Sequence, residues 1–171
     1  MAPRVILIGP PGAGKTTLGH ALGALLEIEF SDTDSLIEDQ EKKSISEIFV
    51  DQGEEYFRGV EKRVVLDALV NSEGVLALGG GAPLSVEVQS ALKNSGLSIM
   101  YLEVSLATAA PRIGFNRDRP LLLGNPRAQW KELLDSRRPI YESVSTKIVN
   151  VDHGTPTELA ELIAREISGE K

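Results

Sequence analysis

Short runs of apolar residues alternate with longer amphipathic segments along the chain. The apolar runs predict five strands, at 5–8, 28–30, 75–78, 98–104 and 147–151. Four further segments place apolar residues at helical spacing, namely 15–26, 54–71, 86–93 and 157–167. Strands that alternate with helices are typical of a parallel sheet covered on both faces. The pattern therefore predicts an α/β, doubly wound fold.

The first predicted strand runs into a glycine-rich segment that ends in lysine and threonine. Residues 9–16 read Gly-Pro-Pro-Gly-Ala-Gly-Lys-Thr and match the phosphate-binding pattern G-x-x-x-x-G-K-[ST]. Glycines allow successive N–H groups to face a phosphate, and the following helix adds positive charge at its N-terminus. Residues expected to bind ATP here are Gly12, Ala13, Gly14, Lys15, Thr16 and Thr17. Lys15 can bridge the β- and γ-phosphates, and the Thr16 hydroxyl can bind Mg²⁺.

Two alternatives to an ATP site exist for residues 9–16. The first is a tight strand-to-helix turn whose glycines serve only packing, but the fixed register of glycines, lysine and hydroxyl favours nucleotide binding. A GTPase would normally carry N-K-x-D and D-x-x-G motifs, and the sequence contains neither. We therefore expect a nucleotide site that does not belong to a regulatory GTPase.

Two aspartates follow the second predicted strand, in Asp32-Thr33-Asp34. In an extended backbone, residues two apart share a face, so both carboxylates are expected to point to one place. That place is the carboxyl edge of the sheet, where open α/β sheets bind ligands. One carboxylate can hold Mg²⁺ through water while the other takes a proton from an acceptor hydroxyl. The alternative for Asp34 is a helix cap.

Arg58 and Glu61 are spaced to meet on one helix face, so Glu61 can orient a guanidinium that binds a ligand carboxylate. The alternative is an exposed ion pair, which contributes little. Nearby Phe49 and Phe57 can form an apolar wall against a carbon ring or belong to the core. Three adjacent glycines, Gly79–Gly81, predict a loop whose main chain approaches a ligand closely, although a flexible turn is the alternative.

Arginines are concentrated in the last third of the chain. Arg112, Arg117 and Arg119 share a segment with Gly114, Pro120 and Gly124, which predicts a mobile, positively charged lid over phosphates. A solvated basic loop is the alternative. Further on, Arg137 and Arg138 precede Pro139, which is expected to constrain a helix turn.

Composition narrows the class of protein. The 171 residues suit one domain, 1–171. The formal net charge of −7 disfavours a nucleic-acid partner, so clustered arginines are stronger candidates for binding a small anionic ligand. The chain has no cysteine, which excludes disulfides and thiolate metal sites and is compatible with a cytoplasmic location. No run approaches the roughly 18 apolar residues of a membrane span, and the N-terminus lacks the apolar core of a secretory signal. A soluble, unprocessed chain is expected.

Taken in order, the motifs resemble those of the shikimate kinase family. They are the 9–16 loop, Asp-Thr-Asp at 32–34, Phe-Arg-x-x-Glu at 57–61, Gly-Gly-Gly at 79–81, Arg-Pro-Leu at 119–121 and Arg-x-Pro-x-Tyr within 137–141. Each motif after the first is weak alone, but six in register over almost the whole chain are specific. An additional Arg117-Asp118 pair departs from the expected lid.

The resemblance implies a P-loop kinase fold with a five-stranded parallel sheet, a substrate-binding helical segment at about 33–61 and a lid at about 112–124. It implies that the protein uses ATP and Mg²⁺ to phosphorylate the 3-hydroxyl of shikimate. It also implies that the protein is a monomer. Arg58 and Arg137 resemble the clamp on the shikimate carboxylate, and Asp34, Gly80 and Gly81 resemble the hydroxyl contacts.

The remaining roles also follow from the resemblance. Asp34 is implied as the catalytic base, with Lys15 and Arg119 as further catalytic residues. Asp32 resembles a residue that holds Mg²⁺ through water. Arg112 resembles an arginine that stacks on adenine, and Pro156 lines the same pocket. Rival assignments are a gluconate kinase, a nucleoside monophosphate kinase and a non-catalytic nucleotide-binding module.

Overall fold

The computed structural model describes residues 2–113 and 125–169. Within them, five parallel strands form one sheet in the order β2-β3-β1-β4-β5. The strands are β1 (Val5–Ile8), β2 (Phe30–Asp32), β3 (Val75–Ala77), β4 (Ser98–Glu103) and β5 (Lys147–Asn150). The helices are α1 (Lys15–Leu26), α2 (Thr33–Glu41), α3 (Ile45–Asn71), the 3-10 helix η1 (Ala82–Leu84), α4 (Val86–Asn94), α5 (Leu106–Ile113), α6 (Pro126–Val144) and α7 (Pro156–Ser168). The predicted α/β fold with a five-stranded parallel sheet is confirmed.

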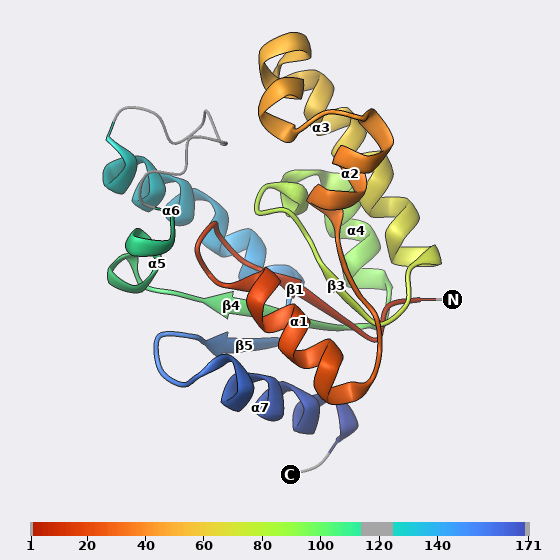
Figure 1. Cartoon of the computed structure of the whole chain (residues 1–171), viewed down its shortest axis with the longest axis vertical. Coiled ribbons are helices and arrows are strands. Elements are labelled where there is room, and N and C mark those ends of the chain that lie inside the picture. Colours follow the sequence, from red (N-terminus) through yellow and green to blue (C-terminus); the bar gives the residue numbers. More distant parts are fainter. Residues whose placement is uncertain (1, 114–124, 170–171) are drawn as a thin grey trace.

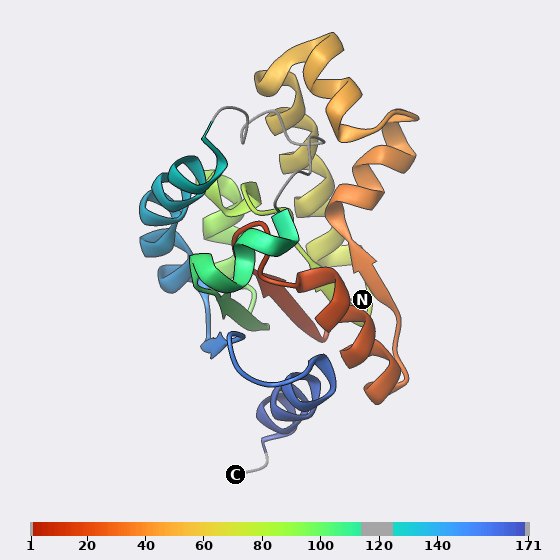
Figure 2. The same ribbon diagram turned by 60° about the vertical axis from the view of Figure 1, so that its left-hand side comes forward.

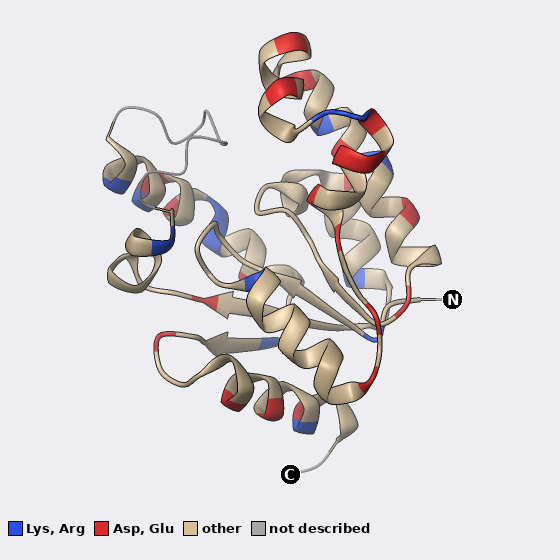
Figure 3. Ribbon diagram, in the orientation of Figure 1, with Lys and Arg blue, Asp and Glu red and all other residues tan. Residues whose placement is uncertain are grey.

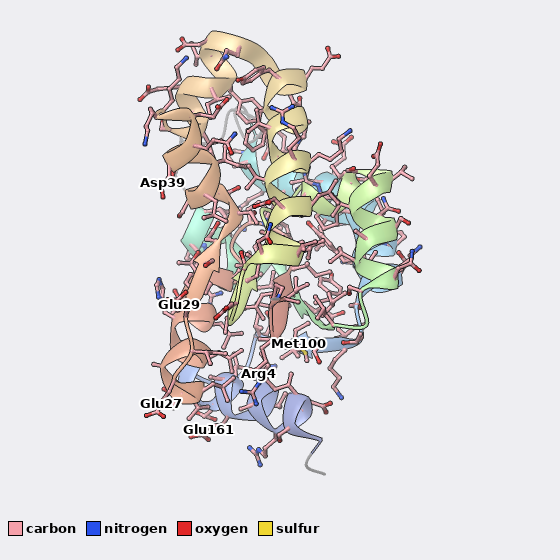
Figure 4. All side chains as sticks on the ribbon, turned by 90° about the vertical axis from the view of Figure 1, so that its right-hand side faces the viewer. Arg4, Glu27, Glu29, Asp39, Met100 and Glu161 are labelled. Carbon is pink, nitrogen blue, oxygen red and sulfur yellow. The ribbon has the colours of Figure 1, made fainter. Side chains whose placement is uncertain are left out.

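Helices cover both faces of the sheet. Figures 1 and 2 show α1 and α7 together on one face, and α4 and α6 on the other. All four residues of β1 are fully buried, because this strand lies at the centre of the sheet. Figure 4 shows Met100 of β4 inside the molecule, whereas Glu29, Asp39 and Glu161 lie at its surface. The main apolar core therefore lies between the sheet and its two helical layers.

A second, smaller apolar cluster lies between α2 and α3, and α2 and the first half of α3 project away from the sheet in Figure 1. Its buried members are Ile37, Ile45, Ile48, Phe57, Val60 and Val64. The backbone of α3 is broken at Gly53, whose φ of 86° and ψ of 169° are not helical. The kink places the ring centroids of Phe49 and Phe57 4.9 Å apart, although eight residues of straight helix rise about 12 Å. The kinked α2–α3 segment therefore encloses a core of its own.

Several element boundaries differ from the sequence prediction. The second strand covers Phe30–Asp32 and not 28–30. Thr33 immediately begins α2, which the apolar pattern did not predict, although the resemblance implied a helical segment over about 33–61. The helix predicted over 54–71 begins earlier, at Ile45. Pro139 lies inside α6, as its expected place at a helix turn allows, and the helix continues to Val144 with this proline exposed at the surface. In the described ranges, no helix is long and apolar enough to cross a bilayer.

Candidate active site

The glycine-rich loop between β1 and α1 has the conformation that an anion cradle requires. Gly9, Gly12 and Gly14 all have positive φ, at 153°, 86° and 88°, and a positive φ near 87° is a conformation that side-chain-bearing residues rarely adopt. Gly14 is the N-cap of α1 and has no side chain to cap the first turn. The N–H groups of that turn are therefore available to an anion, with the helix dipole adding positive charge.

A cavity of about 460 Å³ lies against this loop. Its lining comes from the phosphate loop, the aspartate pair, the glycine triplet and the loop before α7, and comprises residues 11–18, Asp32, Asp34, 78–80, Arg112, Val151, Gly154, Pro156 and Leu159. All six residues predicted for the loop, from Gly12 to Thr17, are among them. The cavity opens at the carboxyl edge of the sheet, as expected for an open α/β fold.

The cavity is lined by basic and acidic side chains, with Lys15 and Arg112 at the phosphate loop and Asp32 and Asp34 at the carboxyl end of β2. Nζ of Lys15 donates to the carbonyls of Gly9 and Pro10, at 2.7 and 3.1 Å. Nη1 of Arg112 donates to the Gly12 carbonyl at 2.9 Å. Figure 3 shows basic residues on α5 and α6 and acidic residues gathered on α2 and the first half of α3. An anionic nucleotide is thus favoured on the loop side of the cavity.

Asp32 and Asp34 converge as predicted, but by a different local structure. Asp32 is the N-cap of α2, and its Oδ1 accepts a hydrogen bond from the Asp34 backbone N–H at 2.8 Å. Asp34 stands in the first helical turn, so the pair is joined by a capping turn and not by an extended strand. The capping role considered for Asp34 belongs to Asp32.

The Asp32 carboxylate also contacts the phosphate loop. Its Oδ2 accepts from the Thr16 hydroxyl at 3.3 Å. Burial raises the pKa of Asp32 above its ordinary value, and the neighbouring Asp34 charge acts in the same direction, whereas the Asp34 N–H, Lys15 and Thr16 lower it. Negative charge is therefore concentrated at a point where a bound cation would relieve it.

Arg58 forms a partly buried ion pair and not the exposed pair considered as the alternative. Its Nη1 lies 2.7 Å from Oε1 of Glu61, and the Glu61 side chain is only 4% exposed. The guanidinium carbon lies 5.3 Å from the ring centroid of Phe57. Phe57 is buried in the small apolar cluster, and Phe49 packs against it while remaining partly exposed. Glu61 and Phe57 thus hold Arg58 in one orientation.

Arg137, in α6, lies against the same Gly79–Gly81 loop as Arg58. The residue is 4% exposed, and its buried Nε has no hydrogen-bond partner among the described residues. The nearby Tyr141 hydroxyl donates to the Gly80 carbonyl at 2.6 Å. Burial raises the pKa of Tyr141 to about 12, so the hydroxyl remains protonated as a donor. A buried guanidinium with a spare donor is suited to an anionic ligand group.

The Gly79–Gly81 loop brings these side chains together. A Cβ on Gly79 would lie 2.6 Å from Oδ1 of Asp34, and one on Gly80 would lie 3.2 Å from Nη1 of Arg137. A Cβ on Gly81 would lie 2.7 Å from Cζ of Arg58. Each glycine therefore leaves the space that one of the three predicted substrate residues occupies. The flexible-turn alternative does not account for this packing, since all three glycines are buried.

Thr33 anchors the Gly79–Gly81 loop and was not predicted as a site residue. This fully buried threonine accepts a hydrogen bond from the Gly79 N–H through its Oγ1, at 2.9 Å. The middle residue of the Asp-Thr-Asp motif thus joins the aspartates to the glycine loop. Its only sequence signal is its position between the two acids.

A substitution at Gly81 tests this packing. Alanine at Gly81 is compatible with the local φ of −93°, so its main effect is the clash with Arg58. We expect Gly81→Ala to weaken acceptor binding at least about tenfold, equivalent to about 1.4 kcal/mol, with nucleotide affinity retained. Calorimetric titration of each ligand measures this split.

Gly59→Ala is the matched control, because a Cβ there approaches nothing nearer than Nη1 of Arg63 at 3.9 Å and alanine favours the helix by about 1 kcal/mol. Equal acceptor affinity in the Gly81 variant and this control would contradict the packing argument.

Three further predicted residues lie nearer the nucleotide end or outside the described ranges. Arg112 lies in the last turn of α5 and donates a hydrogen bond to the Gly12 carbonyl of the phosphate loop. Pro156 begins α7 and lines the cavity. Arg119 and most of the predicted lid lie outside the described residues. Among the described residues, no three His, Asp or Glu side chains cluster as a metal site.

A phosphate cradle beside two carboxylates, with two oriented arginines packed against the adjacent glycine loop, defines the class of protein: it is an ATP-dependent small-molecule kinase. The sequence model of the family described as shikimate kinase matches residues 11–168. The chain belongs to the shikimate kinase family, which confirms the resemblance drawn from the motifs.

Individual relatives agree with this assignment. The chain is 51% identical to a shikimate kinase of Thermobifida fusca over 96% of this chain and 95% of that one. It is 50% identical to a shikimate kinase of Salinispora arenicola, over 96% and 97%. Among solved structures, a shikimate kinase from Acinetobacter baumannii in complex with shikimate is similar, with a TM-score of 0.93 and 34% identity over 99% and 94% of the two chains.

Proposed function

We propose that this kinase transfers the γ-phosphoryl group of ATP to the 3-hydroxyl of shikimate, giving 3-phosphoshikimate and ADP. This is a step toward chorismate and the aromatic amino acids. The observation that carries the proposal is the packing of Asp34, Arg58 and Arg137 against three consecutive glycines beside the phosphate loop. A cyclic polyol with one carboxylate matches this set, since two arginines suit the carboxylate and an aspartate suits a hydroxyl.

In this proposal the acceptor is held from two sides. Arg58 and Arg137 bind the carboxylate, and Asp34 with the backbone of Gly80 and Gly81 binds the hydroxyls. Arg137 is buried and Arg58 is paired with Glu61, so contacts within the protein hold both guanidinium groups in place. Preorganised charges of this kind reduce the free-energy cost of ordering the site during binding.

Transfer requires that the acceptor oxygen lie in line with the γ-phosphorus. The oxygen forms the new P–O bond while the bond to the β–γ bridging oxygen breaks and ADP leaves. The hydroxyl proton passes to Asp34, which also orients the oxygen. Lys15 and the N–H groups of the phosphate loop stabilise the charge on the phosphates, and we assign Arg119 to the same task from the lid.

The residues present fit Mg²⁺. The Thr16 hydroxyl and the Asp32 carboxylate are hard oxygen donors 3.3 Å apart at the mouth of the phosphate loop, and Mg²⁺ prefers such donors together with water and phosphate oxygens. We propose that Thr16 binds the ion and that Asp32 holds it through water. When bound, Mg²⁺ neutralises charge on the β- and γ-phosphates.

We further propose that residues 1–171 act as one catalytic unit and as a monomer in the cytoplasm. Residues 33–61 form its acceptor-binding segment, and 112–124 its lid. The small apolar cluster between α2 and α3 supports the first of these assignments. Arg112 and Pro156 are assigned to the adenine side of the cavity, because both line it near the phosphate loop.

A coupled assay for ADP release tests the proposed function. With ATP and Mg²⁺, shikimate is expected to stimulate ADP release, whereas gluconate and AMP are not, and chelation of Mg²⁺ with EDTA should abolish turnover. Turnover with gluconate or AMP alone would refute the acceptor assignment. Binding of ATP without turnover on any of the three would instead support a nucleotide-binding module.

A further inference from the structure

Side chains from three elements hold the outer side of the phosphate loop. Four consecutive carbonyls, from Gly9 to Gly12, each accept a side-chain hydrogen bond. Lys15 donates to the first two, Trp130 Nε1 donates to Pro11 at 2.8 Å, and Arg112 donates to Gly12. Carbonyls held on the outside of such a loop leave its N–H groups to face an anion.

The donor to Pro11 comes from α6, the helix that also reaches the acceptor side. Trp130 is 1% exposed, and Tyr141 of the same helix donates to the Gly80 carbonyl at 2.6 Å. The two residues are separated by about three helical turns, or roughly 16 Å along the axis, and so lie on one face. Arg137 lies between them on that face and is likewise buried. One helix thus holds a carbonyl of the nucleotide loop and a carbonyl of the glycine loop.

We propose that α6 sets the separation between the phosphate loop and the Gly79–Gly81 loop, with Trp130 as the positioning residue at its nucleotide end. Tyr141 is the corresponding residue at the acceptor end. In-line transfer tolerates little error, because a misplacement of about 1 Å can cost about 10²-fold in rate. The kinetic part of the proposal rests on the proposed function, but the binding part does not.

The variant Trp130→Phe keeps an aromatic ring in the core and removes the N–H that holds Pro11. We expect its dissociation constant for ADP to rise about tenfold and its kcat to fall about tenfold, since a buried carbonyl loses its partner. Its affinity for shikimate alone should stay within about twofold of the parent, because the acceptor end of α6 is untouched. Calorimetry and steady-state kinetics give these three values.

Tyr101→Phe is the matched control. This buried tyrosine packs against Tyr141 with ring centroids 5.2 Å apart, and its hydroxyl has no hydrogen-bond partner among the described residues. The substitution therefore removes a polar group from a buried aromatic residue without releasing either loop. If Trp130→Phe lowers the melting temperature but matches this control in ADP affinity and kcat, Trp130 is only a core residue and the proposal is overturned.

The unmodified protein provides a second test that does not depend on the folding of a variant. Trp130 is the one tryptophan of the chain, so its intrinsic fluorescence reports on the Pro11 contact. Titration with ADP is expected to change the emission of this indole, and no change at saturating ADP would overturn the proposal. Because ADP binding needs no acceptor, this result stands even if shikimate proves not to be the substrate.

Discussion

Replacing Asp34 with asparagine is expected to lower kcat by about 10²- to 10⁴-fold, the range of a lost general base. The amide cannot take the hydroxyl proton, although it can still donate or accept a hydrogen bond. ADP affinity should change little, because the phosphate loop and Lys15 are untouched. Steady-state kinetics with saturating shikimate, together with calorimetric titration of ADP, measure both quantities.

Asp39→Asn is a suitable control for this variant. Asp39 lies in the same helix, Figure 4 shows it at the surface, and it is not among the residues that line the cavity. The control removes one negative charge from α2 and should leave kcat unchanged. If Asp34→Asn turned over as fast as this control, Asp34 would have no role in proton transfer or in orienting the hydroxyl.

Removal of the Arg58 side chain is expected to weaken shikimate binding by about 2 to 5 kcal/mol, the range for one partner of a desolvated charge pair. The loss has two sources. The ligand carboxylate loses its guanidinium, and the Glu61 carboxylate, with 4% of its side chain exposed, loses its ion-pair partner. Calorimetric titration of Arg58→Ala with shikimate gives the change directly.

Arg63→Ala provides the comparison for Arg58→Ala. Arg63 lies farther along α3 and is exposed, so its removal should alter shikimate affinity by no more than a few tenths of a kcal/mol. If Arg58→Ala changed shikimate affinity by as little, the Arg58–Glu61 ion pair would behave like a surface pair and Arg58 would not bind the ligand. Unfolding curves of both variants separate binding effects from stability.

The buried parts of the fold were predictable because their signal is local and apolar. β1, with four fully buried residues, and α1 have the predicted bounds. The first half of α3 was implied by the resemblance but not predicted from the apolar pattern, although Ser44 and Glu47 give the Ser-x-x-Glu signature of a capped helix. The Ser44 hydroxyl does accept from the Glu47 N–H. The apolar pattern did not predict α2, because this helix buries few apolar residues, with Ile37 among them. Its start signals are Asp32 at the N-cap and Asp34 in the first turn.

Site residues that belong to a sequence motif were predictable. Residues whose role depends on tertiary contacts were not. Asp34, Arg58 and Arg137 belong to short patterns that matched a family. Trp130 contacts Pro11 across 119 positions of sequence, and Thr33 contacts Gly79 across 46. No local periodicity encodes such contacts, because they depend on how the sheet places α6 and α2. The convergence of the site was predictable, but the residues that brace it were not.

The separate apolar cluster between α2 and α3 also bears on how enzymes of this shape can be re-engineered. Since the residues of this cluster, which extends to Val64, form a group separate from the main core, segment 33–64 can be exchanged as one piece. Grafting a homologous segment that preserves Thr33 and the buried face of α3 should leave the nucleotide half of the molecule intact. The acceptor contacts in this segment, Asp34 and Arg58, would then be exchanged together, while Arg137 and the Gly79–Gly81 loop would stay in place.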